Sequence, residues 1–219
     1  MEKKSVQIIL QVALAAVVLG LAYWVYMLIS TPIKFEAEQK TREAAVIERI
    51  KDIRTAERTF KSKYQRFTGD FDTLINFVLT EKMEGERKKI DEDDSVAMAQ
   101  AKKKYGKRFK NIEKFTFSVK DSLFKHLTAE QVKELRYVPF SNNQTEFILR
   151  AGMLETNSKV VIPVVECKTP YIAFLDTVKY RQEVINLVDN MTNNFNKYPG
   201  IKFGAMDRGN NEAGNWEEL

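Results

Sequence analysis

Residues 35–64 read FEAEQKTREAAVIERIKDIRTAERTFKSKY and contain neither Gly nor Pro. Apolar side chains recur there every three or four residues, the spacing that places them on one face of an α-helix. This apolar stripe consists of Val46, Ile50, Ile53, Ala56, Phe60 and Tyr64. The charged face opposite consists of Glu43, Arg49, Lys51, Arg54, Glu57 and Arg58. We expect a long amphipathic helix whose stripe packs on the rest of the chain. A coiled coil is the alternative, but its heptads would run only to residue 64.

The preceding residues, 5–33, read SVQIILQVALAAVVLGLAYWVYMLISTPI and carry no charged side chain. About 20 apolar residues are enough for a helix to cross the hydrocarbon core of a membrane. Tyr23, Trp24 and Tyr26 gather toward the end of this stretch, where aromatic rings favour the headgroup layer as an interface belt. A cleaved signal peptide has a shorter apolar region and a small-residue cleavage site. We therefore predict one uncleaved membrane span that forms a rod with the amphipathic helix and can bend at Pro32.

The charges that flank the span bear on its orientation. Lys3 and Lys4 favour a cytoplasmic N-terminus, whereas Lys34, Lys40 and Arg42 weakly favour the reverse. A long C-terminal domain can be exported whatever its charge. We expect the N-terminus inside and the domain outside.

The span carries two features of a helix–helix contact. Ala13, Ala16 and Gly20 are small residues at helical spacing, which lets two helices approach closely. Gln7 and Gln11 lie four residues apart, so their amides share a face and would seek partners within lipid. We predict protein partners or a homo-oligomer through this face. The alternative is that small residues are merely common in spans and that Gln7 lies at the membrane interface.

The remainder of the chain mixes helices with strands. Residues 70–78 predict a short helix capped by Asp70, and residues 127–135 predict another capped by Thr128. Residues 81–114 hold 11 Lys or Arg and 8 Asp or Glu, which indicates a solvated insertion that is helical over 97–105. Because opposite charges alternate in this insertion, we expect no nucleic-acid partner. Strands are predicted at 115–119, 136–140, 145–154 and 159–167, the last two as a hairpin.

Together these elements predict an α+β fold, in which an N-terminal transmembrane helix continues into a long amphipathic helix packed on a small antiparallel sheet. A late helix is expected within 179–197, followed by a loop-rich tail in which Trp216 docks on the domain. The predicted divisions are the cytoplasmic stub and span at 1–33, the long and short helices at 34–80, the insertion at 81–114, and the sheet domain with its tail at 115–219.

The composition argues against most kinds of enzyme. The 219 residues carry a net charge of +5 and include one Cys and one His, which excludes internal disulfides, Cys-based zinc clusters and sites of several histidines. His126 and Cys167 are expected to be structural. No phosphate loop, zinc signature or nucleophile elbow occurs. We expect no catalytic, cofactor-binding or metal-binding residues and no small-molecule substrate; an enzyme with an unfamiliar carboxylate site is the remote alternative.

The stretch from Ala45 to Val78 resembles type IV pilins and type II secretion pseudopilins. In that pattern a membrane-rooted helix ends at an aromatic residue, here Tyr64, and a Gly turn follows, here Gly69, before a short segment with a Leu. The tail phrases YPGIKFG and NNEAGNWE are similar to those of a family of anchored bacterial envelope proteins, which implies no activity. The resemblance implies a bacterial inner-membrane protein with a periplasmic domain, assembling through protein–protein contacts. A non-polymerising adaptor subunit of an envelope complex is the alternative.

A short motif of Asp, then Ser or Thr, then an aliphatic residue occurs four times. It is similar to the O-glycan acceptor motif that some bacteria use outside the cytoplasm. The candidate acceptors are Thr73, Ser95, Ser122 and Thr177.

Overall fold

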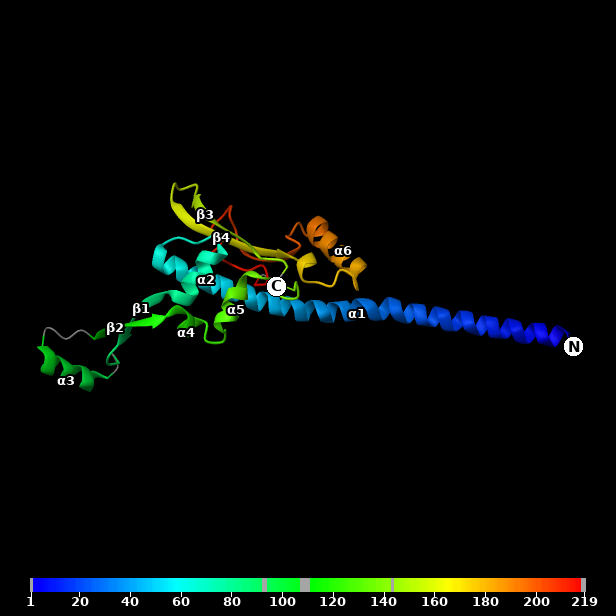
Figure 1. The fold of residues 1–219 in the computed structure, drawn as a ribbon, viewed down its shortest axis with the longest axis horizontal. Coiled ribbons are helices and arrows are strands. Elements are labelled where there is room, and N and C mark those ends of the chain that lie inside the picture. Colours follow the sequence, from blue (N-terminus) through cyan, green and yellow to red (C-terminus); the bar gives the residue numbers. More distant parts are fainter. Residues whose placement is uncertain (1, 92–93, 107–110, 143, 218–219) are drawn as a thin grey trace.

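One helix, α1 (Glu2–Tyr64), extends through the folded domain and far beyond it toward the N-terminus (Figure 1). The structure is a computed structural model that describes residues 2–91, 94–106, 111–142 and 144–217. Pro32 lies inside α1, which continues past it without interruption. The expected rod of span and amphipathic helix is therefore one continuous helix.

The apolar stripe of α1 is the centre of the core. Val46, Ile50, Ile53 and Ala56 are 0% exposed. Tyr64, predicted as the last member of the stripe, is instead 42% exposed, because the chain leaves the helix at the next residue and the last turn stands at the edge of the domain.

Short helices cover one side of the stripe. α2 (Phe71–Thr80) begins at Asp70, whose carboxylate accepts a hydrogen bond from the backbone N–H of Thr73 at 2.9 Å. α4 (Val119–Leu123), α5 (Ala129–Lys133) and the 3-10 turn η2 (Glu134–Arg136) follow. The predicted cap of α5 is confirmed as a reciprocal pair between Thr128 and Gln131. α2 buries Phe71, Leu74, Ile75, Phe77 and Val78.

A three-stranded antiparallel sheet covers the other side, with the order β3-β4-β5. β3 (Ile148–Glu155) and β4 (Val161–Pro170) form the expected hairpin. β5 (Gly200–Gly204) lies in the tail that the sequence predicted to be loop. The glycines of β5 let it approach β4 closely. A Cβ on Gly204 would lie 1.9 Å from the carbonyl oxygen of Val165.

The strand predicted at 136–140 is wrong. Tyr137 forms a single bridge with Glu146, and the chain then turns at Phe140, whose φ is 66°. Pro139 has no N–H to donate, which removes one hydrogen bond that a ladder here would need.

The charged insertion is an arm at the end of the molecule away from the N-terminus (Figure 1). β1 (Lys82–Lys88) pairs antiparallel with β2 (Ile112–Ser118), and α3 (Ser95–Tyr105) lies between them in the chain, where a helix was expected. The sequence did not predict β1, because its residues KMEGERK show no regular alternation of apolar and polar side chains.

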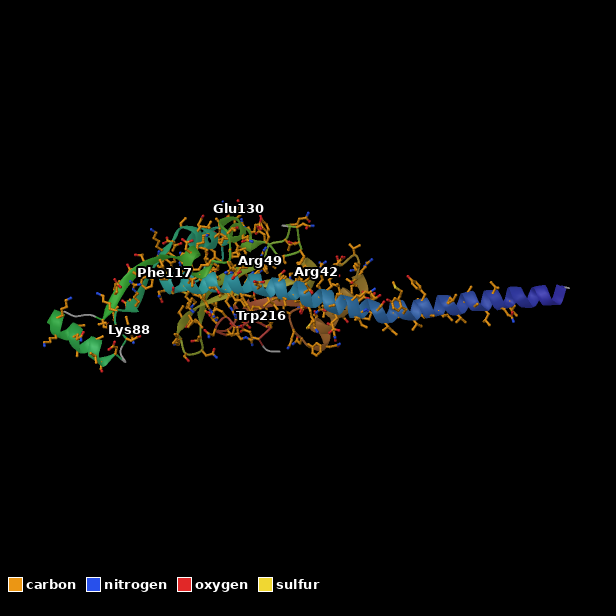
Figure 2. The ribbon with its side chains drawn as sticks, turned by 90° about the horizontal axis from the view of Figure 1, so that it is seen from below. Arg42, Arg49, Lys88, Phe117, Glu130 and Trp216 are labelled. Atoms are coloured by element: carbon orange, nitrogen blue, oxygen red, sulfur yellow. The ribbon has the colours of Figure 1, made fainter. Side chains whose placement is uncertain are left out.

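The tail docks on α1, as predicted. Figure 2 places Trp216 and Glu130 of α5 on opposite sides of α1. The Arg54 guanidinium lies 5.4 Å from the centre of the Trp216 ring and 2.6 Å from the Glu217 carboxylate. Arg58 approaches Glu212 at 3.2 Å, so the charged face of α1 holds the last residues of the domain.

Replacing Ile53 with Ala should lower the free energy of unfolding by about 2–5 kcal/mol, because a fully buried side chain is lost from the middle of the stripe. Lys51→Ala, at an exposed position two residues away on the opposite face of α1, should change it by less than about 0.5 kcal/mol. Denaturant unfolding of the full chain in detergent measures both. Equal midpoints for the two variants would contradict the packing described. Ile53→Val, a smaller truncation, covers the case in which the alanine variant does not fold.

Candidate functional site

The N-terminal part of α1 is apolar and uncovered. Among the described residues, α1 is the one helix long and apolar enough to cross a membrane, by its length and composition. Gln11, Ala13, Ala16 and Gly20 are all exposed, and apart from the neighbouring backbone of α1 itself no atom of the described chain lies within 4 Å of the Cβ position at Gly20. The side chain of Gln7 lies outside the described part of the chain. The predicted helix contacts stay predictions, on a face that the domain leaves open.

The aromatic residues of the predicted interface belt also point into open space. Tyr23 is 66% exposed, Trp24 62% and Tyr26 60%. Because consecutive residues of a helix are about 100° apart, the three rings spread over a little less than half of its circumference. The interface belt stays a prediction.

The folded domain is fastened to α1 just beyond this uncovered part. The ring of Phe35 lies 5.4 Å from that of Tyr180, and Lys179 Nζ lies 3.0 Å from the Glu38 carboxylate. The hydrogen bond from Lys179 lowers the pKa of Glu38. Glu38 also pairs with Arg42 at 2.7 Å. The segment before α6 therefore ties the domain to the first turns of α1 after the apolar stretch.

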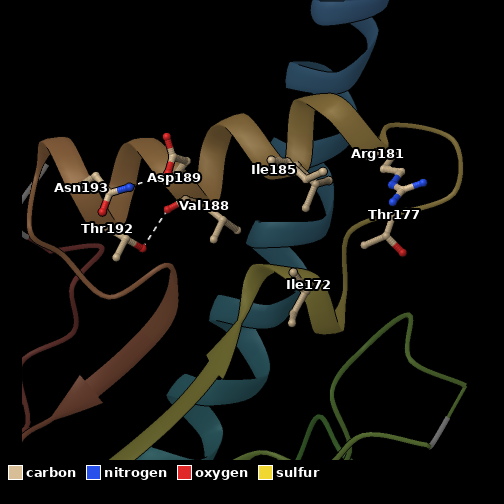
Figure 3. A pocket seen from close by; sticks show the side chains of 9 residues that line it. Ile172, Thr177, Arg181, Ile185, Val188, Asp189, Thr192 and Asn193 are labelled. Carbon is tan, nitrogen blue, oxygen red and sulfur yellow. Dashed lines mark hydrogen bonds between the residues drawn. The ribbon is translucent and has the colours of Figure 1, made fainter.

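An apolar groove of about 600 Å³ lies between α6 (Arg181–Asp189) and the 3-10 turn η3 (Tyr171–Ala173). Figure 3 shows α6 crossing α1, with Ile185 and Val188 extending from α6 toward Ile172. Arg181 and Thr177 lie at one end of the groove. Its lining is completed by Val184, Asp189, Thr192 and Asn193. Ile172 is 60% exposed, so the groove presents apolar surface to its surroundings.

Glu57 was assigned to the charged face of α1 from the sequence, and that assignment is wrong. Its side chain is fully buried, and one carboxylate oxygen accepts a hydrogen bond from the backbone N–H of Thr68 at 3.0 Å. The other oxygen, Oε1, has no hydrogen-bond partner among the described residues. Burial raises the pKa of Glu57 to about 8. The carboxyl group is thus largely neutral at pH 7 and anchors the turn that leads from α1 to α2.

The four candidate glycan acceptors are all exposed. Thr73 is the second residue after the start of α2, and its hydroxyl donates to the Asp70 carboxylate at 2.6 Å. Ser95 begins α3, Ser122 lies in α4, and Thr177 lines the apolar groove. Glycosylation stays a prediction at each of them.

The single His of the sequence pairs with an acidic residue on α1, and the single Cys lies in the core. His126 Nε2 lies 3.2 Å from the Asp52 carboxylate on α1, and its side chain is about half exposed. Cys167 is fully buried, and burial raises the pKa of its thiol well above the usual range. Within the described ranges, no group of three or more His, Cys, Asp or Glu residues is placed to hold a metal ion.

No family model, curated protein or solved structure matches this chain. Its function is therefore argued from its own residues and their geometry.

The buried carboxyl group predicts an unusual pH dependence of stability. Below pH 4.5, Glu57 is protonated in both the folded and the unfolded state; between pH 4.5 and about 8, only the unfolded state releases the proton. Glu57 should therefore lower the free energy of unfolding as pH rises through this window, by at most about 1.4 kcal/mol per pH unit, with no further loss above it.

Unfolding of the wild type and of Glu57→Gln across that range measures this contribution. The difference in unfolding free energy between them should shift in favour of the variant as pH rises. Glu48→Gln, an exposed position on the same helix, controls for the loss of one acidic side chain. A constant difference between Glu57→Gln and the wild type would contradict the raised pKa.

Proposed function

We propose that this chain is a membrane-anchored component of an envelope assembly, pseudopilin-like or secretion-associated, that acts by protein–protein contact. The observation that carries the proposal is the division of α1: its C-terminal half is the core of the domain, whereas its N-terminal half is apolar and uncovered. Such a helix holds a folded domain at a fixed position relative to whatever buries its exposed end.

A lipid bilayer is the simplest environment for that exposed end. Residues 10–33 form about 36 Å of helix, which exceeds the hydrocarbon thickness of about 30 Å. Exposed residues such as Leu19, at 70%, and Val12, at 65%, would be costly to leave in water. The pair Lys3 and Lys4 supports a cytoplasmic N-terminus, with the domain in the periplasm of a bacterial cell.

Association would run through the small residues of the span. Because residues 5–33 contain no charge, an ionic contact between spans is excluded there. Ala13, Ala16 and Gly20 recur at spacings of three and four, so their Cα atoms share one side of α1. This side allows close packing against a second span, whereas Gln11, two residues before Ala13, lies on the opposite side of α1 and is not part of this contact.

The alternative is an adaptor subunit that binds one partner and does not polymerise. The exposed apolar groove along α6 favours it, because a surface of that kind on the folded domain suits a partner protein. The two functions predict different contacts for the span: a second copy of this chain in the assembly, and a different protein in the adaptor.

Membrane attachment predicts that the full chain stays with the membrane fraction after an alkaline carbonate wash of cells that express it. Peripheral proteins are released by this treatment, whereas a protein with an apolar span of this length is retained. Release of the chain into the supernatant would contradict the anchor.

Disulfide cross-linking in cells tests the contact face. Cys167→Ala removes the native thiol without leaving a buried hydroxyl that lacks a partner. In this background, a Cys at Ala16 or Gly20 should give a covalent dimer. Val18→Cys, on the other side of the helix, is the matched control and should give much less.

The products separate the two functions. A self-adduct at residues 16 and 20 supports assembly through the span, and an adduct with a different protein supports the adaptor. Monomer alone at both positions, with the chain in the membrane fraction, would overturn association through this face.

A further inference from the structure

A second cleft, of about 250 Å³, lies on the tail side of α1 and belongs to none of the surfaces above. It is bounded by α1, the π-helical turn η4 (Asn190–Asn194), β5 and the tail. Three aromatic side chains line it: Tyr171, Tyr198 and Trp216. Small-molecule sites are usually clefts that combine aromatic walls with polar groups, and this lining contains both.

The cleft carries an excess of positive charge. Lys197, Lys202 and Arg208 line it, and in the described part of the chain none of them forms an ion pair with an acidic side chain. Elsewhere on the tail face the cations are neutralised, as Arg54 is by Glu217. Among the described residues of the lining, Glu43 is the one that carries a carboxyl group, and burial raises its pKa, which disfavours its negative charge. The lining therefore favours an anion.

An unpaired donor belongs to the same lining. The Nε1 atom of Trp216 is buried and has no hydrogen-bond partner among the described residues. A buried N–H without an acceptor costs free energy, so such an atom in a folded protein calls for an acceptor that is missing. A water molecule or a ligand oxygen beside the ring would supply one.

The backbone around the cleft is held in uncommon conformations. η4 is a π-helical turn, and Asn196 and Glu212 have φ values of 49° and 53°. The side chain of Asn215 fixes the tail here, donating to the carbonyl of Gly200 at 2.8 Å and accepting from the backbone N–H of Lys202 at 3.1 Å. π-turns and left-handed residues that their surroundings hold in place gather at functional sites.

We propose that this cleft binds a small aromatic carboxylate. Its carboxylate would face Lys197, Lys202 and Arg208, and its ring would lie against the aromatic walls. Arg208 suits a planar carboxylate because its guanidinium can donate two parallel hydrogen bonds. This site is independent of the membrane anchor and of the span contacts, and no pattern in the sequence predicted it.

Phenylacetate is the probe, and its neutral analogue phenylacetamide is the matched control. The chain has two Trp, so Trp24→Phe leaves Trp216 as the single indole whose fluorescence reports on the cleft. Phenylacetate should change the Trp216 emission in a saturable manner in the full chain in detergent, and phenylacetamide should bind at least tenfold more weakly.

Variants of the lining test the assignment. Lys202→Gln and Arg208→Gln should each raise the Kd for phenylacetate about tenfold, whereas Lys133→Gln, an exposed cation on the other side of α1, should leave it unchanged. Thermal unfolding of each variant verifies that the fold is kept, as expected for an exposed Arg208. Calorimetry on Trp216→Phe, which keeps an aromatic ring but removes the N–H, should also show weaker binding.

Three results would overturn the proposal. They are the absence of saturable binding by phenylacetate, equal binding of phenylacetamide, and unchanged affinity in folded Lys202→Gln and Arg208→Gln.

Discussion

The structure depends on burying one apolar stripe along α1. Side chains such as Ile50, Ile53 and Phe60 would each cost about 1.5–3 kcal/mol if left in water. One layer of structure cannot cover the whole width of this stripe. The short helices therefore pack on one side of it, and the sheet of β3, β4 and β5 packs on the other. Acidic residues of the C-terminal tail then form ion pairs with Arg54 and Arg58. Most of the domain is thus arranged as a cover for one helix.

The same helix links the domain to the uncovered apolar segment. Contacts of Phe35 with Tyr180 and of Glu38 with Lys179 begin within one turn of the end of that segment. The domain therefore has little freedom to pivot on α1. If the apolar segment lies in a membrane, as proposed, α6 lies at the membrane end of the domain and the arm that carries α3 lies at the far end (Figure 1).

The sequence predicted those elements whose apolar residues repeat with a clear period or whose ends carry a cap. The stripe of α1, the Thr128 cap and the hairpin of β3 and β4 are of this kind. It failed where tertiary context overrides the local pattern. Gly200 and Gly204 looked like loop residues, yet their missing side chains are what let β5 approach β4.

Glu57 was missed because it lies among charged residues in the sequence. Its position four residues after Ile53 and three before Phe60 places it on the stripe side of α1, where the turn at Thr68 covers it. The aromatic cleft was missed for a different reason. The cleft joins residues from α1, η4, β5 and the tail, which no spacing along the chain connects. Its signal lies in cations that have no acidic partner within the described ranges, and such a signal can be seen only in the folded structure.

The central claim is that α1 is one unbroken helix from the apolar segment into the core, through Pro32. The most direct test is a pulsed electron paramagnetic resonance measurement between spin labels at Val18 and Lys51, in the full chain with Cys167→Ala in lipid nanodiscs. A continuous helix predicts a single, narrow distribution near about 50 Å, from 33 residues at 1.5 Å each. A broad distribution centred well below that distance would mean a hinge at Pro32 and would contradict the account.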